Sequence, residues 1–348
     1  ILVLFIISLS FFLLAQFIPS RKGDALNDDM FRASEIMGEA MAALKECQSE
    51  GGLPLDRDND PNQTGLIGVE SSLLTTTIGN LEAKRTTTNP NFAALIVFLL
   101  NEAGVERGDT VAVGASSSFP ALIVAVLSAA KAMDLHPLII NSLGASQWGA
   151  NIMDFHWLDM LSCLLKADIF DFQPIALSLG GEKDKGEDMS PEGRSFLFEE
   201  IRKSGFPFIN ESDLRENVEI RMQLYEKSAA GKKIKAFINI GGSWANMGTD
   251  AEVLELKPGL VRIKQLPPLG NRGVIFEMAS RNIPVIHLLF VRGLVKRYGL
   301  SWDPVPLPSP GKERLFHRAR ERQPMFLVLS VVYLLLVVFI FIVRSKLR

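Results

Sequence analysis

The sequence has few of the residues that build metal or redox sites. Its 348 residues include two cysteines, Cys47 and Cys163, and four histidines. The cysteines stand far apart and without metal-ligand spacing, so they indicate neither a zinc site nor a disulfide framework, and we interpret them as small buried apolar residues. The acidic loop Asp56–Asp60 fails the EF-hand pattern, because Pro61 and Ile67 stand where glycine and glutamate are needed. Walker A, HExxH, CxxC and GxGxxG patterns are absent as well. No metal and no cofactor are therefore expected.

The sequence also lacks the basic surplus that is typical of nucleic-acid-binding proteins. Its formal net charge is −2 at pH 7, and its basic residues gather near the two ends, which leaves the body between them acidic. Nucleic acid is therefore excluded as a partner. The basic clusters, which we interpret as contacts to membrane lipid headgroups, are Arg21–Lys22, Lys312–Arg322 and Arg344–Arg348.

Charge is missing altogether from two long apolar runs, residues 1–18 and 325–343. About 20 apolar residues span a bilayer as a helix, so these runs predict an N-terminal transmembrane anchor and a C-terminal transmembrane helix. A cleaved signal peptide would need a shorter apolar core and a small-residue cleavage site. The chain opens on Ile1 rather than methionine, and we expect residues to precede it. The basic clusters favour opposite orientations, so charge alone does not decide the topology.

The region between the apolar runs alternates between predicted strands and helices. This alternation is typical of right-handed crossovers and a mostly parallel sheet. We therefore predict an α/β fold with a three-layer body over residues 24–300, followed by a Pro-rich linker and basic juxtamembrane segment over 301–324. The predicted strands are 110–113, 138–140, 175–179, 234–240 and 283–288. The predicted helices are 28–49, 90–103, 120–133, 152–166, 213–229 and 291–298, with another that begins at 190–191.

Two glycine- and serine-rich segments follow predicted strands, at the sheet edge where open α/β proteins bind ligands. Three interpretations remain open. The segments are ordinary strand-to-helix turns, with Ser118 as a helix cap before Pro120; they bind a phosphate or carboxylate through hydroxyl and N–H groups; or they hold a nucleophile. A plain turn needs the fewest assumptions, and the extra hydroxyls favour a carboxylate site over a nucleophile. The candidate ligand-binding residues are Gly114, Ser116, Ser117, Ser118, Gly241, Gly242, Ser243 and Asn246.

Ser116 is the candidate nucleophile. A nucleophile elbow has the pattern G-x-S-x-G, which Gly114 and Ser116 fit, but Ser118 replaces the second glycine. The base would be His287, because it ends a predicted strand on the same edge of the sheet. No orienting acid is identifiable, and a lone histidine at such a position is commonly a core residue. The sequence thus favours a protein without catalytic activity.

Lys84 and Arg85 form a further candidate site, because two cations followed by the hydroxyl-rich stretch TTTNPNFAAL could hold carboxylates. A solvent-facing basic pair ahead of a helix also explains them.

Taken together, six stretches resemble the poly-gamma-glutamate system protein family, membrane-anchored components associated with bacterial synthesis of this capsule-type polymer. No stretch is specific alone, but the combination is, and with the apolar ends it covers most of the chain. The sequence departs from the family in having Ser117 where glycine is expected, and SWANMGT after Gly242. The stretches are 65–97, 108–122 (GDTVAVGASSSFPAL), 145–151 (ASQWGAN), 178–181 (SLGG), 235–242 (KAFINIGG) and 284–289 (PVIHLL).

The resemblance implies an accessory protein of poly-gamma-glutamate synthesis or export. Its body would bind polymer carboxylates or synthase subunits, and it would lie in the bacterial cell membrane with the body outside the cytoplasm. Because the polymer is a polyanion and the body is acidic, binding would need a local basic or N–H-rich cleft. Two alternatives stay open. One is a serine-dependent amide hydrolase or transferase acting on gamma-glutamyl bonds through Ser116 and His287, and the other is a structural scaffold beside the synthase.

Overall fold

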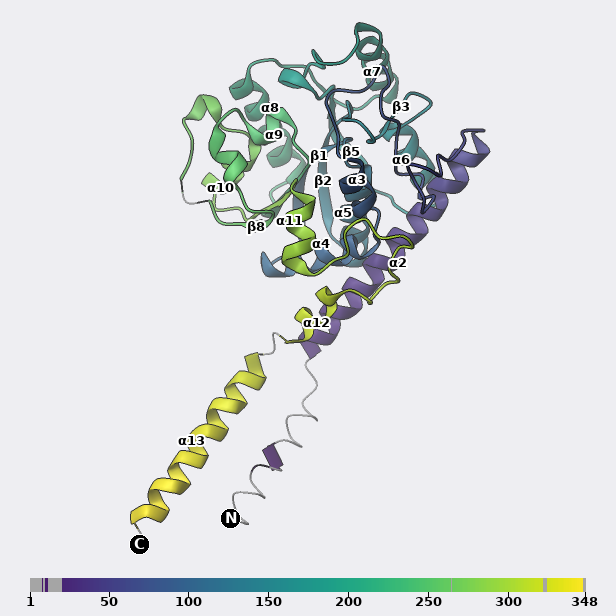
Figure 1. Ribbon diagram of the computed structural model, residues 1–348. Coiled ribbons are helices and arrows are strands. Elements are labelled where there is room, and N and C mark those ends of the chain that lie inside the picture. Colours follow the sequence, from purple (N-terminus) through teal and green to yellow (C-terminus); the bar gives the residue numbers. More distant parts are fainter. Residues whose placement is uncertain (1–7, 9, 12–20, 264, 322–323, 347–348) are drawn as a thin grey trace. The chain divides into compact units, whose positions relative to one another are not determined.

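The structure is a computed structural model (Figure 1), and it describes residues 8, 10–11, 21–263, 265–321 and 324–346. The chain divides into two compact units. The smaller unit consists of residues 1–28 and 316–348, and the larger, which we call the body, of residues 29–315. The body therefore extends beyond the boundary that the sequence predicted at residue 300.

The smaller unit contains α13 (Pro324–Lys346), the start of α2 (Arg21–Glu50) and most of α12 (Arg314–Glu321). Within it, Ser8 and Tyr333 share a hydroxyl–hydroxyl hydrogen bond of 2.6 Å, and the Phe11 ring lies 5.5 Å from the Tyr333 ring. Taken over the residues that the structure describes, no helix is long and apolar enough to cross a membrane.

This finding corrects the predicted location in a bacterial membrane with two spans and an extracytoplasmic body. A span needs about 20 apolar residues in one helix, and no described helix meets that requirement. The predicted C-terminal transmembrane helix, 325–343, is helical but is not supported as a span. The predicted N-terminal anchor, 1–18, lies almost entirely outside the described residues.

A seven-stranded sheet forms the centre of the body, in the order β6-β5-β2-β1-β7-β9-β8. Neighbouring strands are parallel, except that β8 is antiparallel to β9 at one edge. The prediction of an α/β body with a mostly parallel sheet is confirmed. The strands are β1 (Thr110–Ser116), β2 (His136–Ser142), β5 (Pro174–Ser178), β6 (Phe208–Ile209), β7 (Ile234–Ile240), β8 (Gly259–Val261) and β9 (Val285–Leu288).

The strand order reverses direction beside β1. From β1 the chain moves outward through β2, β5 and β6, and it then returns to place β7 on the other side of β1. The connections that follow β1 and β7 therefore diverge at the carboxyl ends of these two strands. In open α/β sheets this reversal opens the crevice in which ligands bind.

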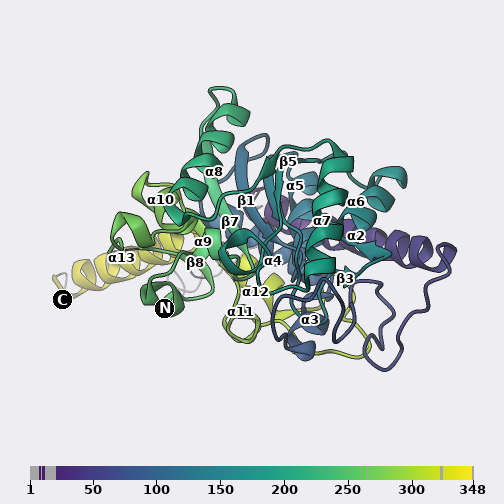
Figure 2. The ribbon, with the colours of Figure 1, turned by 90° about the horizontal axis from the view of Figure 1, so that it is seen from above.

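Helices cover both faces of the sheet, as Figure 2 shows. One face packs against α4 and α5, and the other against α8 and α10. Residues 91–100 of α4 are all buried, as expected for a helix that is apolar all round. Besides the greater part of α2, the helices of the body include α3 (Leu81–Thr87), α4 (Asn91–Glu102), α5 (Pro120–Ala132), α6 (Trp157–Lys166), α7 (Pro191–Ser204), α8 (Leu214–Ala229), α9 (Trp244–Met247), α10 (Val274–Ser280) and α11 (Val291–Tyr298), with 3₁₀ turns η1 (Glu182–Asp184), η2 (Ala251–Glu255) and η3 (Leu269–Asn271).

The helix predicted over 152–166 begins only at α6. A short hairpin of β3 (Asn151–Ile152) and β4 (Phe155–His156) precedes it. His156 caps α6. Its ring Nδ1 accepts a hydrogen bond from the backbone N–H of Leu158 (3.2 Å), and the backbone N–H of His156 donates to the carboxylate of Asp159 (2.9 Å). The start of α6 could not be predicted from a capping pattern, because a histidine occupies the position that Ser or Thr usually has.

Cys47 and Cys163 form a disulfide between α2 and α6, with their Cα atoms 6.2 Å apart. The interpretation of the cysteines as buried apolar residues was wrong, and both side chains are only half-buried. The two residues are 116 positions apart in the chain, so their pairing depends on how α2 and α6 pack and leaves no local sequence pattern.

Residues 301–313 lie against α3 and α4, and they belong to the body. The buried carboxylate of Glu313 accepts hydrogen bonds from Asn89 Nδ2 (2.8 Å) and from the backbone of Ser301 (3.0 Å). The Gly311 N–H donates to Asn91 Oδ1 (3.2 Å). The proline-rich segment is therefore held against the start of α4.

Candidate functional site

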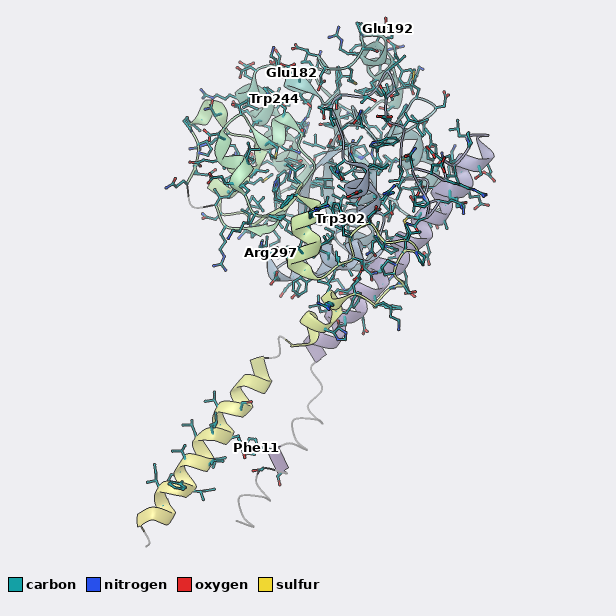
Figure 3. The ribbon with its side chains drawn as sticks, in the orientation of Figure 1. Phe11, Glu182, Glu192, Trp244, Arg297 and Trp302 are labelled. Atoms are coloured by element: carbon teal, nitrogen blue, oxygen red, sulfur yellow. A yellow bond between two sulfur atoms is a disulfide. The ribbon has the colours of Figure 1, made fainter. Side chains whose placement is uncertain are left out.

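A cavity of about 440 Å³ lies at the carboxyl ends of the strands, where the strand order reverses. Its wall comes from the loops after β1, β2, β5, β7 and β9 and from residues 76–84. In Figure 3, Glu182 and Trp244, which both line this cavity, lie near each other at one end of the body. This is the position at which α/β proteins of this kind bind ligands.

Lys84 is the basic residue of the cavity wall. It lies on α3 and its side chain is buried, with 3% of the residue exposed. Its Nζ donates hydrogen bonds to the carbonyl oxygen of Ser118 and to Ser146 Oγ (2.8 Å), and it lies 4.0 Å from the centre of the Phe119 ring. No ion pair to Lys84 is found among the residues that the structure describes. Because burial disfavours the charged form, the pKa of Lys84 falls to about 7.

Arg85, the neighbour of Lys84, faces away from the cavity. Its guanidinium binds the carboxylate of Asp303 through two hydrogen bonds, Nε to Oδ1 (2.7 Å) and Nη2 to Oδ2 (2.5 Å). This pairing raises the pKa of Arg85. The sequence predicted that Lys84 and Arg85 form one basic site. In the structure Arg85 is paired with Asp303 of the segment 301–313, and Lys84 lines the cavity without it.

The turn after β1 leaves few backbone amides for a ligand. The N–H of Ser117 donates to the Ser142 carbonyl (3.0 Å), that of Ser118 to Ser116 Oγ (3.3 Å), and that of Phe119 to the Ser116 carbonyl (3.1 Å). Ser117 is fully buried, and its hydroxyl accepts a hydrogen bond from Asn141 Nδ2 (2.9 Å). The backbone amides of this turn are thus used within the protein, and of its three serines Ser116 and Ser118 line the cavity whereas Ser117 does not.

The helix that follows this turn starts as predicted at Pro120 but is capped differently. The residue at the cap position is Phe119, and no side chain caps the helix. Ser118 Oγ instead accepts a hydrogen bond from the backbone of Ser146 (2.9 Å). Ser118 therefore joins the loops after β1 and β2, which is a tertiary role that a capping pattern does not predict.

Gly114 and Asn246 are in contact inside the protein. A Cβ on Gly114 would overlap the Asn246 side chain. The amide of Asn246 is fully buried and its Nδ2 and Oδ1 form no hydrogen bond within the described part of the chain. Neither residue lines the cavity, and their contact belongs to the packing between β1 and α9.

His287 is buried in β9, directly beside Asn239 of β7. Asn239 Nδ2 donates to His287 Nδ1 (3.0 Å), and burial lowers the pKa of His287 to about 4. Among the described residues no hydrogen bond joins His287 to Ser116, and His287 does not line the cavity. The structure therefore does not assemble the predicted Ser116–His287 pair.

The second glycine-rich segment contributes part of the cavity wall. Gly242 and Ser243 line the cavity together with Trp244. Gly241 has φ 76°, and a Cβ there would lie 3.1 Å from the Cβ of Ser116. A glycine is needed at Gly241 because the backbone is left-handed and approaches the turn after β1 closely.

Two acidic residues of the cavity wall, Asp188 and Glu182, were missed by sequence reasoning. Both lie in the loop after β5. Asp188 Oδ1 is buried and has no hydrogen-bond partner within the described residues, and burial raises the pKa of this carboxyl. The stretch GGEKDKGED, directly after a predicted strand, is the sequence signal that could have marked them.

A buried ion pair between Arg221 and Asp184 supports the same edge of the sheet. Arg221 Nη2 lies 2.6 Å from Asp184 Oδ2 and donates to Ser178 Oγ (2.9 Å). Ser178 Oγ donates to Asp184 Oδ1 (2.8 Å) and lies 3.0 Å from Ser142 Oγ, which lines the cavity. This network fixes the ends of β2 and β5, and nothing in the local sequence pairs an arginine of α8 with an aspartate of η1.

Comparisons with protein-family models, with curated proteins and with solved structures found no significant match to this chain.

Proposed function

We propose that this chain is an accessory protein of poly-gamma-glutamate synthesis or export, acting beside the synthase subunits, and that its cavity binds a gamma-glutamyl unit. The observation that carries the proposal is Lys84, a buried amine in the cavity wall without an acidic partner in the described part of the chain. A ligand carboxylate would supply the missing counter-charge and would favour the ammonium form of Lys84. The hydroxyls of Ser116 and Ser118 offer further hydrogen-bond donors to such a ligand.

The position of the stretches that carry the family resemblance supports this proposal. Each of the six contributes at least one residue to the wall of the cavity at the strand ends, although they are spread from residue 65 to residue 289. A scaffold without a ligand site would give no reason for this convergence. The contributed residues include Lys84, Ser116, Ser146, Gly180, Gly242 and Leu289.

The acidic side chains of the cavity narrow the choice of ligand. Asp188 and Glu182 would repel the internal units of the polymer, because the only charged group of each internal unit is a carboxylate. The amino-terminal unit of the polymer carries an ammonium group as well as a carboxylate. We therefore propose that this end of the chain is recognised, with its carboxylate toward Lys84 and its ammonium group toward the acidic loop.

Calorimetric titration of the full chain with a gamma-glutamyl oligomer at low salt and pH 6 tests the proposal. Lys84→Met should weaken binding at least about tenfold, since it removes a charge-assisted contact. Lys233→Met, at an exposed lysine outside the cavity, should bind like the wild type. An oligomer acetylated at its amino end should bind more weakly. If the wild type does not bind, or if Lys84→Met binds equally well, the proposal is refuted.

A further inference from the structure

Ser146 and Lys84 lie in the same cavity wall, in the arrangement that a nucleophile and its base require. Ser146 Oγ accepts a hydrogen bond from Lys84 Nζ at 2.8 Å, which is within the reach needed for proton transfer. Both residues line the cavity, and Ser146 is 8% exposed. We infer that Ser146 is a nucleophile and Lys84 its general base, for acyl transfer from an amide or ester that enters the cavity. The inference depends on this pair alone and not on the ligand proposed above.

The fold holds Ser146 in place from two sides. Residues 74–79 run alongside the loop after β2: the Thr76 N–H donates to the Ala145 carbonyl (2.9 Å), and the Gln147 N–H donates to the Thr77 carbonyl (2.9 Å). On the other side the Ser146 N–H donates to Ser118 Oγ (2.9 Å). A nucleophile must be held close to its productive geometry, and these contacts fix the backbone on both sides of Ser146.

Contacts with its neighbours also fix the position of the Lys84 side chain. It lies on α3, whose first turn is capped by Asn80 Oδ1 accepting from the Ala83 N–H (2.7 Å). Its Nζ is held between the Ser118 carbonyl, Ser146 Oγ and the Phe119 ring. Among the described residues, no carboxylate lies within ion-pair distance of Lys84 Nζ. The charged form of this amine is therefore not stabilised by a counter-charge.

The protonation state of Lys84 suits the role of a base. An ordinary lysine would be neutral in only about one molecule in 2,500 at pH 7. Burial brings the pKa of Lys84 to about 7, so roughly half of the molecules carry the neutral amine at that pH. The two roles of Lys84 use two protonation states: the ammonium ion binds a carboxylate, and the amine meets an uncharged amide or ester.

The reaction balances without a further reagent. Ser146 Oγ bonds to the carbonyl carbon while its proton moves to Lys84 Nζ, and the carbonyl oxygen takes the electron pair. The Ser118 hydroxyl accepts from the Ser146 N–H, and because Ser118 also lines the cavity, its own proton is available to such an oxygen. The bond to the leaving group then breaks as Lys84 returns the proton to the departing amine or alkoxide. Water, activated by Lys84 in the same way, releases the acyl group from Ser146 as a carboxylic acid.

Ser116 lacks such a base. Its Oγ accepts from the Ser118 N–H, and within the described residues no basic side chain forms a hydrogen bond with it. Sequence patterns do not indicate Ser146, because Gly144-Ala145-Ser146-Gln147-Trp148 departs from G-x-S-x-G and because the usual base of that pattern is a histidine. Lys84 and Ser146 are 62 residues apart in the chain, so no local motif links them.

Labelling of the full chain with a small fluorophosphonate, followed by peptide mass mapping, tests the pair. We expect the label on Ser146, no label there in Ser146→Ala, and labelling at least tenfold slower at pH 7 in Lys84→Met. Ser195→Ala, at an exposed serine of α7, serves as the matched control and should label like the wild type. Circular dichroism of each variant shows whether it is folded.

The pH dependence of labelling in the wild type needs no variant. The rate should rise between about pH 6 and 8 and then level off, as Lys84 loses its proton. A rate that keeps rising tenfold per pH unit to pH 9 would indicate hydroxide as the base and would overturn the inference. So would an unlabelled Ser146, or a folded Lys84→Met that labels at the wild-type rate. If Ser146 is labelled but the oligomer does not bind, only the proposed ligand is refuted. If the oligomer binds but Ser146 is not labelled, only the roles of Ser146 and Lys84 as nucleophile and base are refuted.

Discussion

Lys84 links the stability of the fold to pH, and replacing it with methionine isolates the effect. The folded chain releases the Lys84 proton near pH 7, whereas the unfolded chain holds it up to the ordinary value of 10.5. Between these values the unfolded chain binds more protons, so the free energy of unfolding rises with pH. Methionine has a similar length and no proton to lose. Lys84→Met should therefore lack this part of the rise.

The expected magnitude follows from the depth of burial. With a folded-state pKa of about 7, the contribution of Lys84 to the free energy of unfolding grows by about 2 kcal/mol between pH 7 and pH 9. The side chain is almost fully buried, so solvent screening reduces this figure little. The desolvated amine thus destabilises the fold near neutral pH, as residues held for a ligand or a reaction commonly do.

Urea denaturation of the wild type and Lys84→Met at pH 7, 8 and 9 measures the difference. The stability of the wild type relative to the variant should increase by about 2 kcal/mol over this range. Lys233→Met, at an exposed lysine, should follow the wild type at each pH. A difference between wild type and Lys84→Met that stays constant within about 0.5 kcal/mol would show that the amine is not desolvated, and the reasoning on this site would fail.

Three further predictions concern the surrounding fold, each measured by urea denaturation. Replacing Cys47 and Cys163 by serine should lower the free energy of unfolding by about 2–4 kcal/mol, and reduction of the wild type should lower it comparably; no change would contradict the disulfide. Gly114→Ala should cost about 1–3 kcal/mol by overpacking the buried amide behind it, and a neutral effect would contradict that contact. Arg221→Met should cost about 3–5 kcal/mol, because it leaves Asp184 charged and buried; adding Asp184→Asn should recover part of this loss, and no recovery would count against the ion pair.

Elements with a strong local pattern could be predicted from the sequence. The strand predicted over 234–240 and the helix predicted over 291–298 have the same bounds as β7 and α11. The short elements β6, α9, β8 and α10 were not predicted, because a few residues carry too little periodicity. The hairpin before α6 was missed for a related reason, since two-residue strands leave no alternation to detect.

The sequence predicted only some of the residues that line the cavity. Ser116, Ser118 and Lys84 do line the cavity, because a serine-rich turn after a parallel strand lies at the ligand-binding edge. Ser117 has the same residue type but is buried against Asn141. Ser116 ends β1, whereas Ser117 and Ser118 lie in the turn that follows it. The path of that turn decides which of these serines lines the cavity, and the residue types alone do not predict it.

The sequence by itself determined the fold class, because apolar runs of strand and helix length alternate along the chain and each run must be buried somewhere. Only the tertiary structure decided what the polar residues do. Lys84 and Ser146 are 62 residues apart, and Arg85, next to Lys84, is paired with Asp303 instead. The pKa of a lysine and the base available to a serine are properties of the atoms packed around them. Those atoms come from five strand ends and the segment that covers them, and no local pattern in the sequence records how these parts meet.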